Sequence, residues 1–211
     1  MLVAGGKRTE APARSVCILP PGASSIEPKA PGRVIRFFSP VPEVLAPLAT
    51  NGDDYANDLP GVRPIGAPFV PAGSFGVRVY EIDRLKSDQP GRPPSFQTAT
   101  MNVMWIEQDG PHDRSRLAPH AHEDFEEGAI VVMGEYVQHL RTPWMADACQ
   151  WRDDEHVKCG PGMVTIVPPN VIHTSEALGA GRHIMLNIFA PARSDHIKSG
   201  MVLNANEYLA G

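Results

Sequence analysis

The chain has few cysteines, no surplus of positive charge and no long hydrophobic run. Its three cysteines are an odd number without C-x-x-C spacing, too sparse for a disulfide framework, and they indicate a reducing compartment. Its 19 basic residues face 24 acidic ones, so no basic surplus is present to bind a nucleic-acid backbone or an anionic membrane. No apolar stretch approaches the length of a membrane span or a signal-peptide core. These absences predict a cytoplasmic protein that binds neither nucleic acid nor membrane.

Glycine and proline are plentiful. The 211 residues include 19 glycines and 22 prolines, which predict many turns and few long helices. Prolines recur throughout residues 1–70 and interrupt any regular element there. We therefore expect two parts: an irregular, proline-rich N-terminal extension over residues 1–70, in the form of an arm or a set of short strands, and one domain over residues 71–211.

From Ser74 onward, short runs of β-branched and aromatic residues alternate with Gly, Pro or Asp about every dozen residues. Such spacing is typical of short strands joined by tight turns, and no stretch shows sustained helical periodicity. The fold class expected is all-β, a sandwich or a barrel. The predicted strands span residues 76–82, 98–107, 128–133, 136–142, 163–167, 172–176 and 183–189.

Histidines carry the main chemical signal. His120 and His122 are two residues apart, so in an extended segment both imidazoles point to the same side. Carboxylates follow at once, and two of them compete as a partner for the pair. Glu126 shares the face of His122 if the strand is unbroken, whereas Glu127 is equally eligible if the chain turns at Glu123. Acidic residues at the intervening positions are poor strand formers and favour the turn.

The order of these residues resembles the metal-binding cupins. The first cupin motif, G(X)5HXH(X)3,4E(X)6G, is matched by His120, His122, Glu127 and Gly134, and the second, G(X)5PXG(X)2H(X)3N, is matched by Gly162, Pro168 and His173. The resemblance covers roughly residues 110–191. Three motif positions differ, namely Arg114, Asn170 and Ala177. Asn tolerates the left-handed turn conformation that the motif glycine supplies, so the change at residue 170 is mild.

This resemblance implies a double-stranded β-helix, the cupin jelly-roll barrel, with one metal ion bound by His120, His122, Glu127 and His173. The motif spacing favours Glu127 over Glu126. Imidazoles and a carboxylate suit a divalent transition metal, for which Fe2+ is favoured and Mn2+, Ni2+, Zn2+ and Cu2+ are possible. Four ligands on an octahedral ion leave two positions open. A structural zinc site would more often be closed by thiolates, and no cysteine lies within the motifs.

Residues after Gly134 supply the catalytic candidates Tyr136, His139 and Arg141. On a strand His139 and Arg141 share one face, and Tyr136, with Gln138 and Leu140, takes the other. If the first face points inward, Arg141 would anchor a substrate carboxylate or phosphate; a solvated outer face is the equal alternative. His183 and Asn187 point either inward or to solvent, Arg193 receives no role, and the solvent histidines expected are His112, His156 and His196.

Three classes of function fit such a site. A mononuclear non-haem dioxygenase acting on a small acidic or oxygenated molecule is preferred, because a redox-active ion with adjacent open positions can bind a bidentate substrate beside oxygen. A non-redox isomerase or lyase, or a binding protein for a small ligand, are the alternatives. The proline-rich arm and the open sheet edges of a small jelly roll also predict a homodimer.

Overall fold

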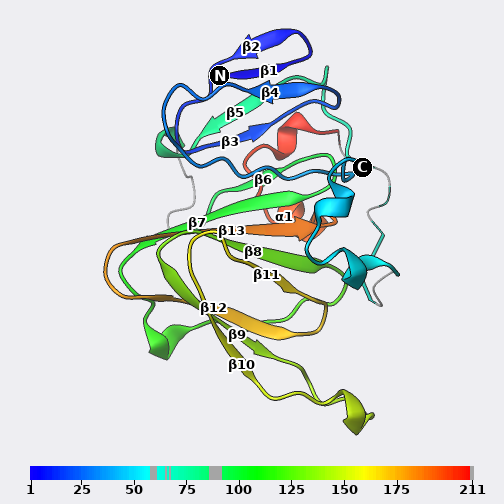
Figure 1. Cartoon of the computed structure of the whole chain (residues 1–211), viewed down its shortest axis with the longest axis vertical. Helices are drawn as coiled ribbons and strands as arrows, with labels where there is room; N and C mark the ends of the chain where they lie inside the picture. Colours follow the sequence, from blue (N-terminus) through cyan, green and yellow to red (C-terminus); the bar gives the residue numbers. More distant parts are fainter. Residues whose placement is uncertain (58–60, 65, 67, 86–91, 210–211) are drawn as a thin grey trace. The chain divides into compact units, whose positions relative to one another are not determined.

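A computed structural model describes residues 1–57, 61–64, 66, 68–85 and 92–209, and in this part the chain is nearly all β (Figure 1). The expected fold class is therefore confirmed. Its helices are short: α1 is Ser194–Lys198, and the 3-10 turns are η1 Ala46–Leu48, η2 Gly52–Tyr55, η3 Ile82–Arg84, η4 Arg114–Arg116, η5 Ala148–Gln150 and η6 Ala205–Glu207. Within the described ranges, no helix has the length and apolar character needed to cross a membrane.

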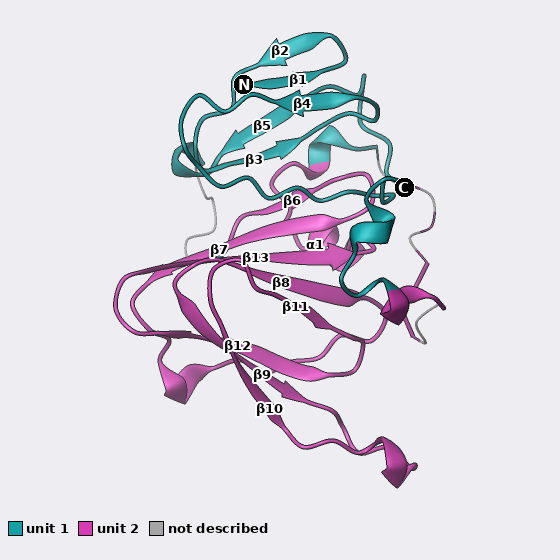
Figure 2. Ribbon diagram, in the orientation of Figure 1, with its two compact units in different colours: residues 1–52, 69–92, 206–211 teal, residues 53–68, 93–205 magenta. Residues whose placement is uncertain are grey.

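The chain divides into two compact units (Figure 2). Unit 1 comprises residues 1–52, 69–92 and 206–211, and unit 2 comprises residues 53–68 and 93–205. The two units are thus interleaved along the sequence, whereas the composition of the chain suggested one boundary after residue 70. Proline content alone does not reveal which segments pair, because pairing depends on partners that are distant in sequence.

Unit 1 contains two small antiparallel sheets. One has the strand order β2-β1-β4 and the other pairs β3 with β5. Leu2 and Ala4 are buried on the central strand of the first sheet, where Leu2 pairs with both Thr9 and Ile26. Residues 1–26 are therefore a set of short strands, one of the two forms expected for them. The strands are β1 Leu2–Ala4, β2 Lys7–Thr9, β3 Ser15–Ile18, β4 Ser24–Ile26 and β5 Arg78–Glu81.

Unit 2 contains a five-stranded sheet of order β11-β8-β13-β7-β6 and a three-stranded sheet of order β10-β9-β12, in which all pairs are antiparallel. The predicted strands from residue 98 onward all appear, with shifted ends, and β6 and β10 are additions. Together the two sheets form the double-stranded β-helix expected from the cupin motifs. The strands are β6 Ser95–Gln97, β7 Asn102–Asp109, β8 Glu126–Met133, β9 Glu135–Arg141, β10 Glu155–Cys159, β11 Val164–Val167, β12 Ile172–Leu178 and β13 Arg182–Ala190.

The core of unit 2 lies between these two sheets. Alternate residues of each strand point inward, so β8 contributes Ala129 and Val131 while β9 contributes Tyr136. These side chains pack with Ala177 of β12 and Met185 of β13, which brings both sheets into one cluster. This apolar cluster fills one part of the barrel, and the histidine cluster lies in a different part.

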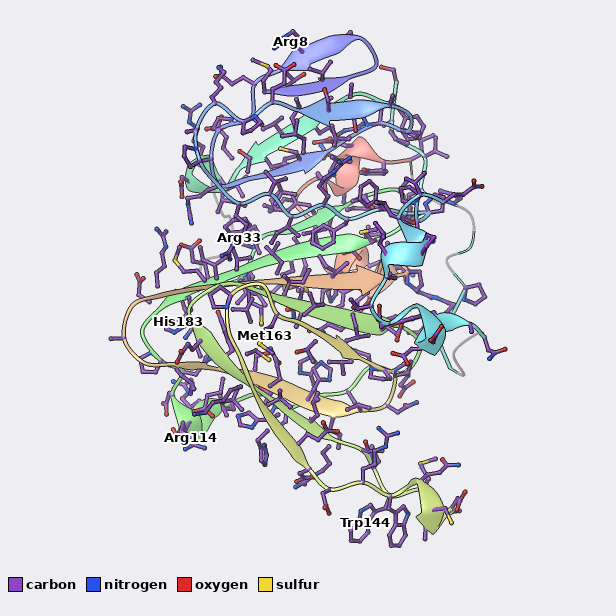
Figure 3. The ribbon with its side chains drawn as sticks, in the orientation of Figure 1. Arg8, Arg33, Arg114, Trp144, Met163 and His183 are labelled. Atoms are coloured by element: carbon purple, nitrogen blue, oxygen red, sulfur yellow. The ribbon has the colours of Figure 1, made fainter. Side chains whose placement is uncertain are left out.

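Two turn residues show why the motif tolerates some substitutions and not others. Asn170, at a motif glycine position, has φ 66° and confirms that asparagine adopts the left-handed turn there. Gly134 has φ +82°, and a Cβ atom on it would lie 2.3 Å from Cδ2 of His183. Glycine is therefore needed at residue 134 both for its backbone conformation and for the approach of the buried His183 ring, which Figure 3 labels.

The connection between β9 and β10 carries two exposed tryptophans. The rings of Trp144 and Trp151 are stacked, with centroids 4.8 Å apart and an interplanar angle of 13° (Figure 3). This aromatic pair orders the end of the hairpin without contributing to the barrel core.

Candidate metal centre

The histidine cluster is assembled by backbone pairing at one end of unit 2. His120 and His173 form an isolated antiparallel bridge, in which His120 N donates to His173 O at 3.1 Å and His173 N donates to His120 O at 2.8 Å. Asn170 N donates to the carbonyl of His122 at 2.5 Å, which fixes the second histidine of the pair against the turn before β12. The chain then bends at residues 123 and 124, as predicted, before β8 begins.

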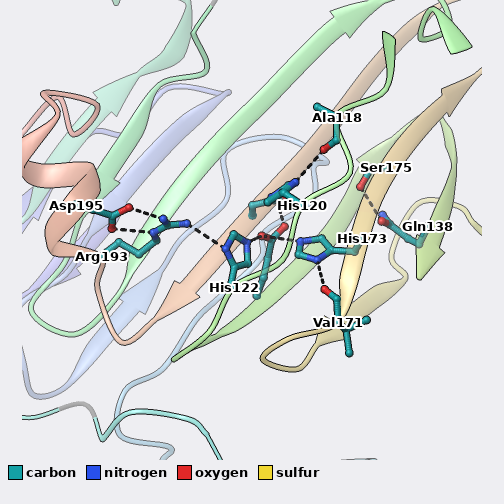
Figure 4. Close-up of polar contacts among 11 residues, drawn as sticks. Ala118, His120, His122, Gln138, Val171, His173, Ser175, Arg193 and Asp195 are labelled. Carbon is teal, nitrogen blue, oxygen red and sulfur yellow. Dashed lines mark hydrogen bonds and ion pairs between the residues drawn. The ribbon is translucent and has the colours of Figure 1, made fainter. Parts of the chain in front are cut away.

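Four side chains converge at this point (Figure 4). His120, His122, Glu127 and His173 each offer one ligand atom, and these atoms all lie within 4.8 Å of one another. Glu127 Oε2 lies 2.9 Å from His122 Nε2 and 3.4 Å from His173 Nε2. His120 is exposed and the other three are buried, so His120 is the member of the cluster that reaches the surface.

Backbone carbonyls orient two of the imidazoles. His120 Nδ1 lies 3.0 Å from the carbonyl of Ala118, and His173 Nδ1 lies 2.9 Å from that of Val171. A carbonyl can only accept, so Nδ1 of each ring carries a proton, and in the neutral ring Nε2 then has the lone pair that a metal ion would bind. A hydrogen bond of this kind on the second ring nitrogen is what fixes metal-binding histidines in proteins.

The charge state of the cluster suits a cation. Burial raises the pKa of Glu127, but the hydrogen bonds from His122 and His173, together with the charges of these two residues, outweigh it and bring the pKa to about 2. Burial lowers the pKa of His120, so this imidazole is neutral at physiological pH. Burial also lowers the pKa of His173, but the hydrogen bonds to Glu127 and to the Val171 carbonyl, together with the charge of Glu127, raise it by more. One anionic carboxylate thus lies among imidazoles in a largely buried position.

These residues fit a single divalent transition metal. Two ligands on one ion at about 2.0–2.2 Å are separated by roughly 3 to 4.5 Å, which matches the spread of the cluster to within a few tenths of an ångström. Three nitrogens and one oxygen without a thiolate suit the borderline metals. Within the described residues, no other group of three or more His, Cys, Asp or Glu side chains has this geometry.

Glu127, and not Glu126, faces the histidines. Glu127 is buried on the inward face of β8 in phase with Ala129, whereas Glu126 points the other way and accepts a hydrogen bond from Tyr55 at 3.3 Å. The bend before β8 resets the alternation, which is why the parity counted from His122 does not apply.

The structure places two of the catalytic candidates on the opposite face from the cluster. On β12 the inward residue His173 pairs with Leu140, so His139 and Arg141 point outward. His139 Nε2 lies 2.9 Å from Glu176 Oε2 and its Nδ1 lies 2.8 Å from Nδ1 of His156. Arg141 is exposed and forms an ion pair with Asp154. An anchoring role for Arg141 at the metal centre does not fit this geometry, and the alternative of an outer face is the one observed.

Tyr136 does point inward, but into the apolar core. It pairs with Ala177, four residues beyond His173 on β12, which corresponds to about 13 Å along the strand. Burial, together with the charge of Glu107, raises the pKa of Tyr136 to about 12. Its hydroxyl therefore keeps its proton at neutral pH, and the structure gives it the position of a core residue.

Two polar residues to which the sequence assigned no definite role contact the cluster, and a third is buried in the same barrel. Asn187 of β13 donates from Nδ2 to Glu127 Oε1, and Arg193 Nη1 lies 3.4 Å from Nδ1 of His122. Gln138 is buried in the barrel, where it pairs with Ser175, two residues beyond His173, and Ser175 donates to its Oε1 at 2.7 Å. Strand alternation puts Gln138 on the same face as Tyr136, and Asn187 on the same face as Met185. Taking the face of the hydrophobic residue as the inward one therefore predicts an inward position for both polar residues.

The expected solvent histidines differ from one another. His156 is exposed, as predicted, and His112 is partly buried and accepts a hydrogen bond from the backbone N of Ala177 at 2.7 Å. His196 is buried, so the prediction of a solvent position for it is wrong. Its ring contacts the edge of Phe189 at a centroid distance of 5.1 Å, a contact that depends on α1 folding back onto β13. For His183 the sequence allows an inward or a solvent position, and the structure places it inward, buried against Tyr136.

Comparisons with known proteins give matches among solved structures alone. No protein-family model matches the chain, and no curated protein matches it. KdgF from Halomonas sp. is 20% identical, with a TM-score of 0.39 over 52% of this chain and 87% of that one. A conserved protein of Klebsiella pneumoniae with a double-stranded beta-helix domain is 18% identical, with a TM-score of 0.39 over 54% and 84%. The Drosophila melanogaster CENP-C cupin domain is 10% identical, with a TM-score of 0.33. The match covers 44% of this chain and 62% of that one, so it spans less than two thirds of the CENP-C chain.

Proposed function

We propose that this cupin barrel is a mononuclear non-haem metal dioxygenase that acts on a small acidic or oxygenated molecule. The observation that carries the proposal is the convergence of three imidazoles and one anionic carboxylate on one point, with His120 exposed to solvent. When bound there, a redox-active divalent ion such as Fe2+ would supply the chemistry for oxygen activation and leave two coordination positions for reactants. We propose the same four residues as its ligands.

The position of Arg193 supports the proposal that the substrate is acidic. Its Nε and Nη2 face Asp195, while Nη1 faces His122. An imidazole that ligates through Nε2 carries its proton on Nδ1, so it cannot accept a hydrogen bond from Nη1 in that state. The Nη1 group is then available to donate to an anionic group of a substrate beside the cluster. Stacking of the guanidinium over the Phe125 ring, 4.6 Å from its centroid, holds it in place.

The first experiment measures metal content. Purified protein reconstituted with Fe2+ without oxygen should contain one ion per chain by elemental analysis. His122→Ala should contain none, while His156→Ala, which changes an exposed histidine of β10, should retain the full equivalent. A full equivalent in the His122→Ala protein would refute the ligand assignment.

The second experiment tests the reaction. Oxygen uptake is followed after adding a panel of carboxylated diketones and catechols to the Fe2+ protein, with His156→Ala as the matched control. Consumption of one of them with oxygen uptake, abolished in His122→Ala, is the expected result. Turnover that persists under nitrogen or with Zn2+ would contradict the dioxygenase and indicate an isomerase or lyase, and binding without turnover would indicate a ligand-binding protein. For an acidic substrate, Arg193→Gln should raise KM about 10- to 100-fold, the equivalent of one charged hydrogen bond.

A further inference from the structure

The two carboxylate oxygens of Glu127 have different partners. Oε2 is the atom nearest the histidines, 2.9 Å from His122 Nε2 and 3.4 Å from His173 Nε2. Oε1 accepts a hydrogen bond from Nδ2 of Asn187. The neighbouring strands β8 and β13 make this contact possible, because Asn187 pairs with Ala129 and Glu127 pairs with Phe189, one inward position apart.

The orientation of the Asn187 amide follows from the charge on Glu127. A carboxylate only accepts hydrogen bonds, so the NH2 group must face Oε1, and the opposite rotamer would place two acceptors against each other. The contact is a charge-assisted hydrogen bond in a buried place, where such bonds are stronger than between neutral groups. It fixes the rotation of the carboxylate about its last bond.

We propose that Asn187 is a positioning residue that holds Glu127 as a one-oxygen metal ligand, an inference that rests on the proposed metal centre. A carboxylate can bind an ion through one oxygen or through both. With Oε1 held by Asn187, the three imidazoles and Oε2 occupy four positions of an octahedral ion and leave two open. A two-oxygen Glu127 would occupy five and leave one, too few for a substrate and oxygen to bind side by side.

The test removes the amide donor and counts coordinated water. Asn187→Leu keeps a similar volume but cannot donate to Oε1. Mn2+ affinity is measured by titration, and the number of waters on bound Mn2+ is measured by solvent-proton relaxation. We expect the wild type to show two waters, and the variant to show one and to bind Mn2+ about 10- to 100-fold more weakly, the usual effect of losing a partner of a metal ligand.

Gln138→Leu is the matched control. It also removes a buried inward amide of unit 2, but one that contacts Ser175 and Met185 and not Glu127. Its Mn2+ affinity should stay within about threefold of the wild type, with two waters, because it leaves the ligands of the cluster untouched.

A double-mutant cycle separates positioning from a general effect on folding. In a Glu127→Ala background, Asn187→Leu should change the Mn2+ affinity less than about twofold, because its effect acts through Glu127. If Asn187→Leu fails to fold by circular dichroism, Asn187→Thr, which suits a strand but is too short to reach Oε1, takes its place. Wild-type affinity and two waters in the folded variant would overturn the inference alone, whereas a wild-type protein that binds no Mn2+ would overturn the metal centre as well.

Discussion

Acid should destabilise this protein partly through His196. Burial lowers the pKa of this imidazole to about 4, and the neighbouring Arg193 charge adds to the effect against the opposing charge of Asp195. In the unfolded chain the imidazole titrates near pH 6.5, so between pH 6.5 and 4 the unfolded state binds more protons than the folded state. The contribution of His196 to stability is therefore fully present above about pH 6.5 and is lost as the pH falls toward 4.

The size of the effect follows from the shift. A difference of about 2.5 pKa units corresponds to about 3.4 kcal/mol at 1.36 kcal/mol per unit. At pH 5, which is above the folded-state pKa, only part of this difference is lost, and the neighbouring Asp195 side chain is 63% exposed, so solvent screens the charges there. We therefore expect a loss of about 1–2 kcal/mol between pH 7.5 and pH 5.

Urea unfolding of the metal-free protein, with a chelator present, measures this loss. The wild-type protein is compared with the His196→Phe variant, which keeps a ring against Phe189 but cannot bind a proton at residue 196. Because both proteins contain the same groups at the metal centre, the difference between their pH dependences reports residue 196 together with its coupling to neighbouring charges. The wild type should lose about 1–2 kcal/mol more than the variant between the two pH values, whatever their difference at pH 7.5. Equal losses in both proteins would refute the reasoning.

Three further predictions concern the ligand, a turn and the assembly. Glu127→Gln should weaken metal binding markedly while Glu126→Gln, whose side chain contacts Tyr55, should be nearly silent in calorimetric titrations; the reverse ranking would move the ligand. Gly134→Ala should cost about 2–4 kcal/mol in urea unfolding, because its φ is positive and its Cβ would overlap His183, and a loss under about 0.5 kcal/mol would contradict this. Light scattering at micromolar concentration should give twice the chain mass of 22.9 kDa, and the single-chain mass would rule out the proposed dimer.

The fold class could be predicted because its signals are local, and the cluster because its residues match the two cupin motifs. Short runs of β-formers between turn residues mark strands whatever they pair with, and most of unit 2 follows them. The motif match includes His120, His122 and His173, and the bend at Glu123 and Asp124 lets β8 start a new alternation in which Glu127 points inward. The interleaving of the two units had no such signal, since it depends on long-range pairs such as Cys17 with Val79.

By itself the sequence determined which residues share a face, and the tertiary structure decided which face points inward. Alternation puts His139 with Arg141 and Gln138 with Tyr136 on any strand, because successive side chains of an extended chain point to opposite sides. The pairing of Leu140 with His173 then turned Gln138 inward and Arg141 outward. Tertiary structure also decided which residue contacts Glu127. Asn187 lies 60 residues away in the sequence and comes close only because β13 pairs with β8. Burial of His196 also needed α1 to pack against Phe189, and no pattern within five helical residues records a contact with another element.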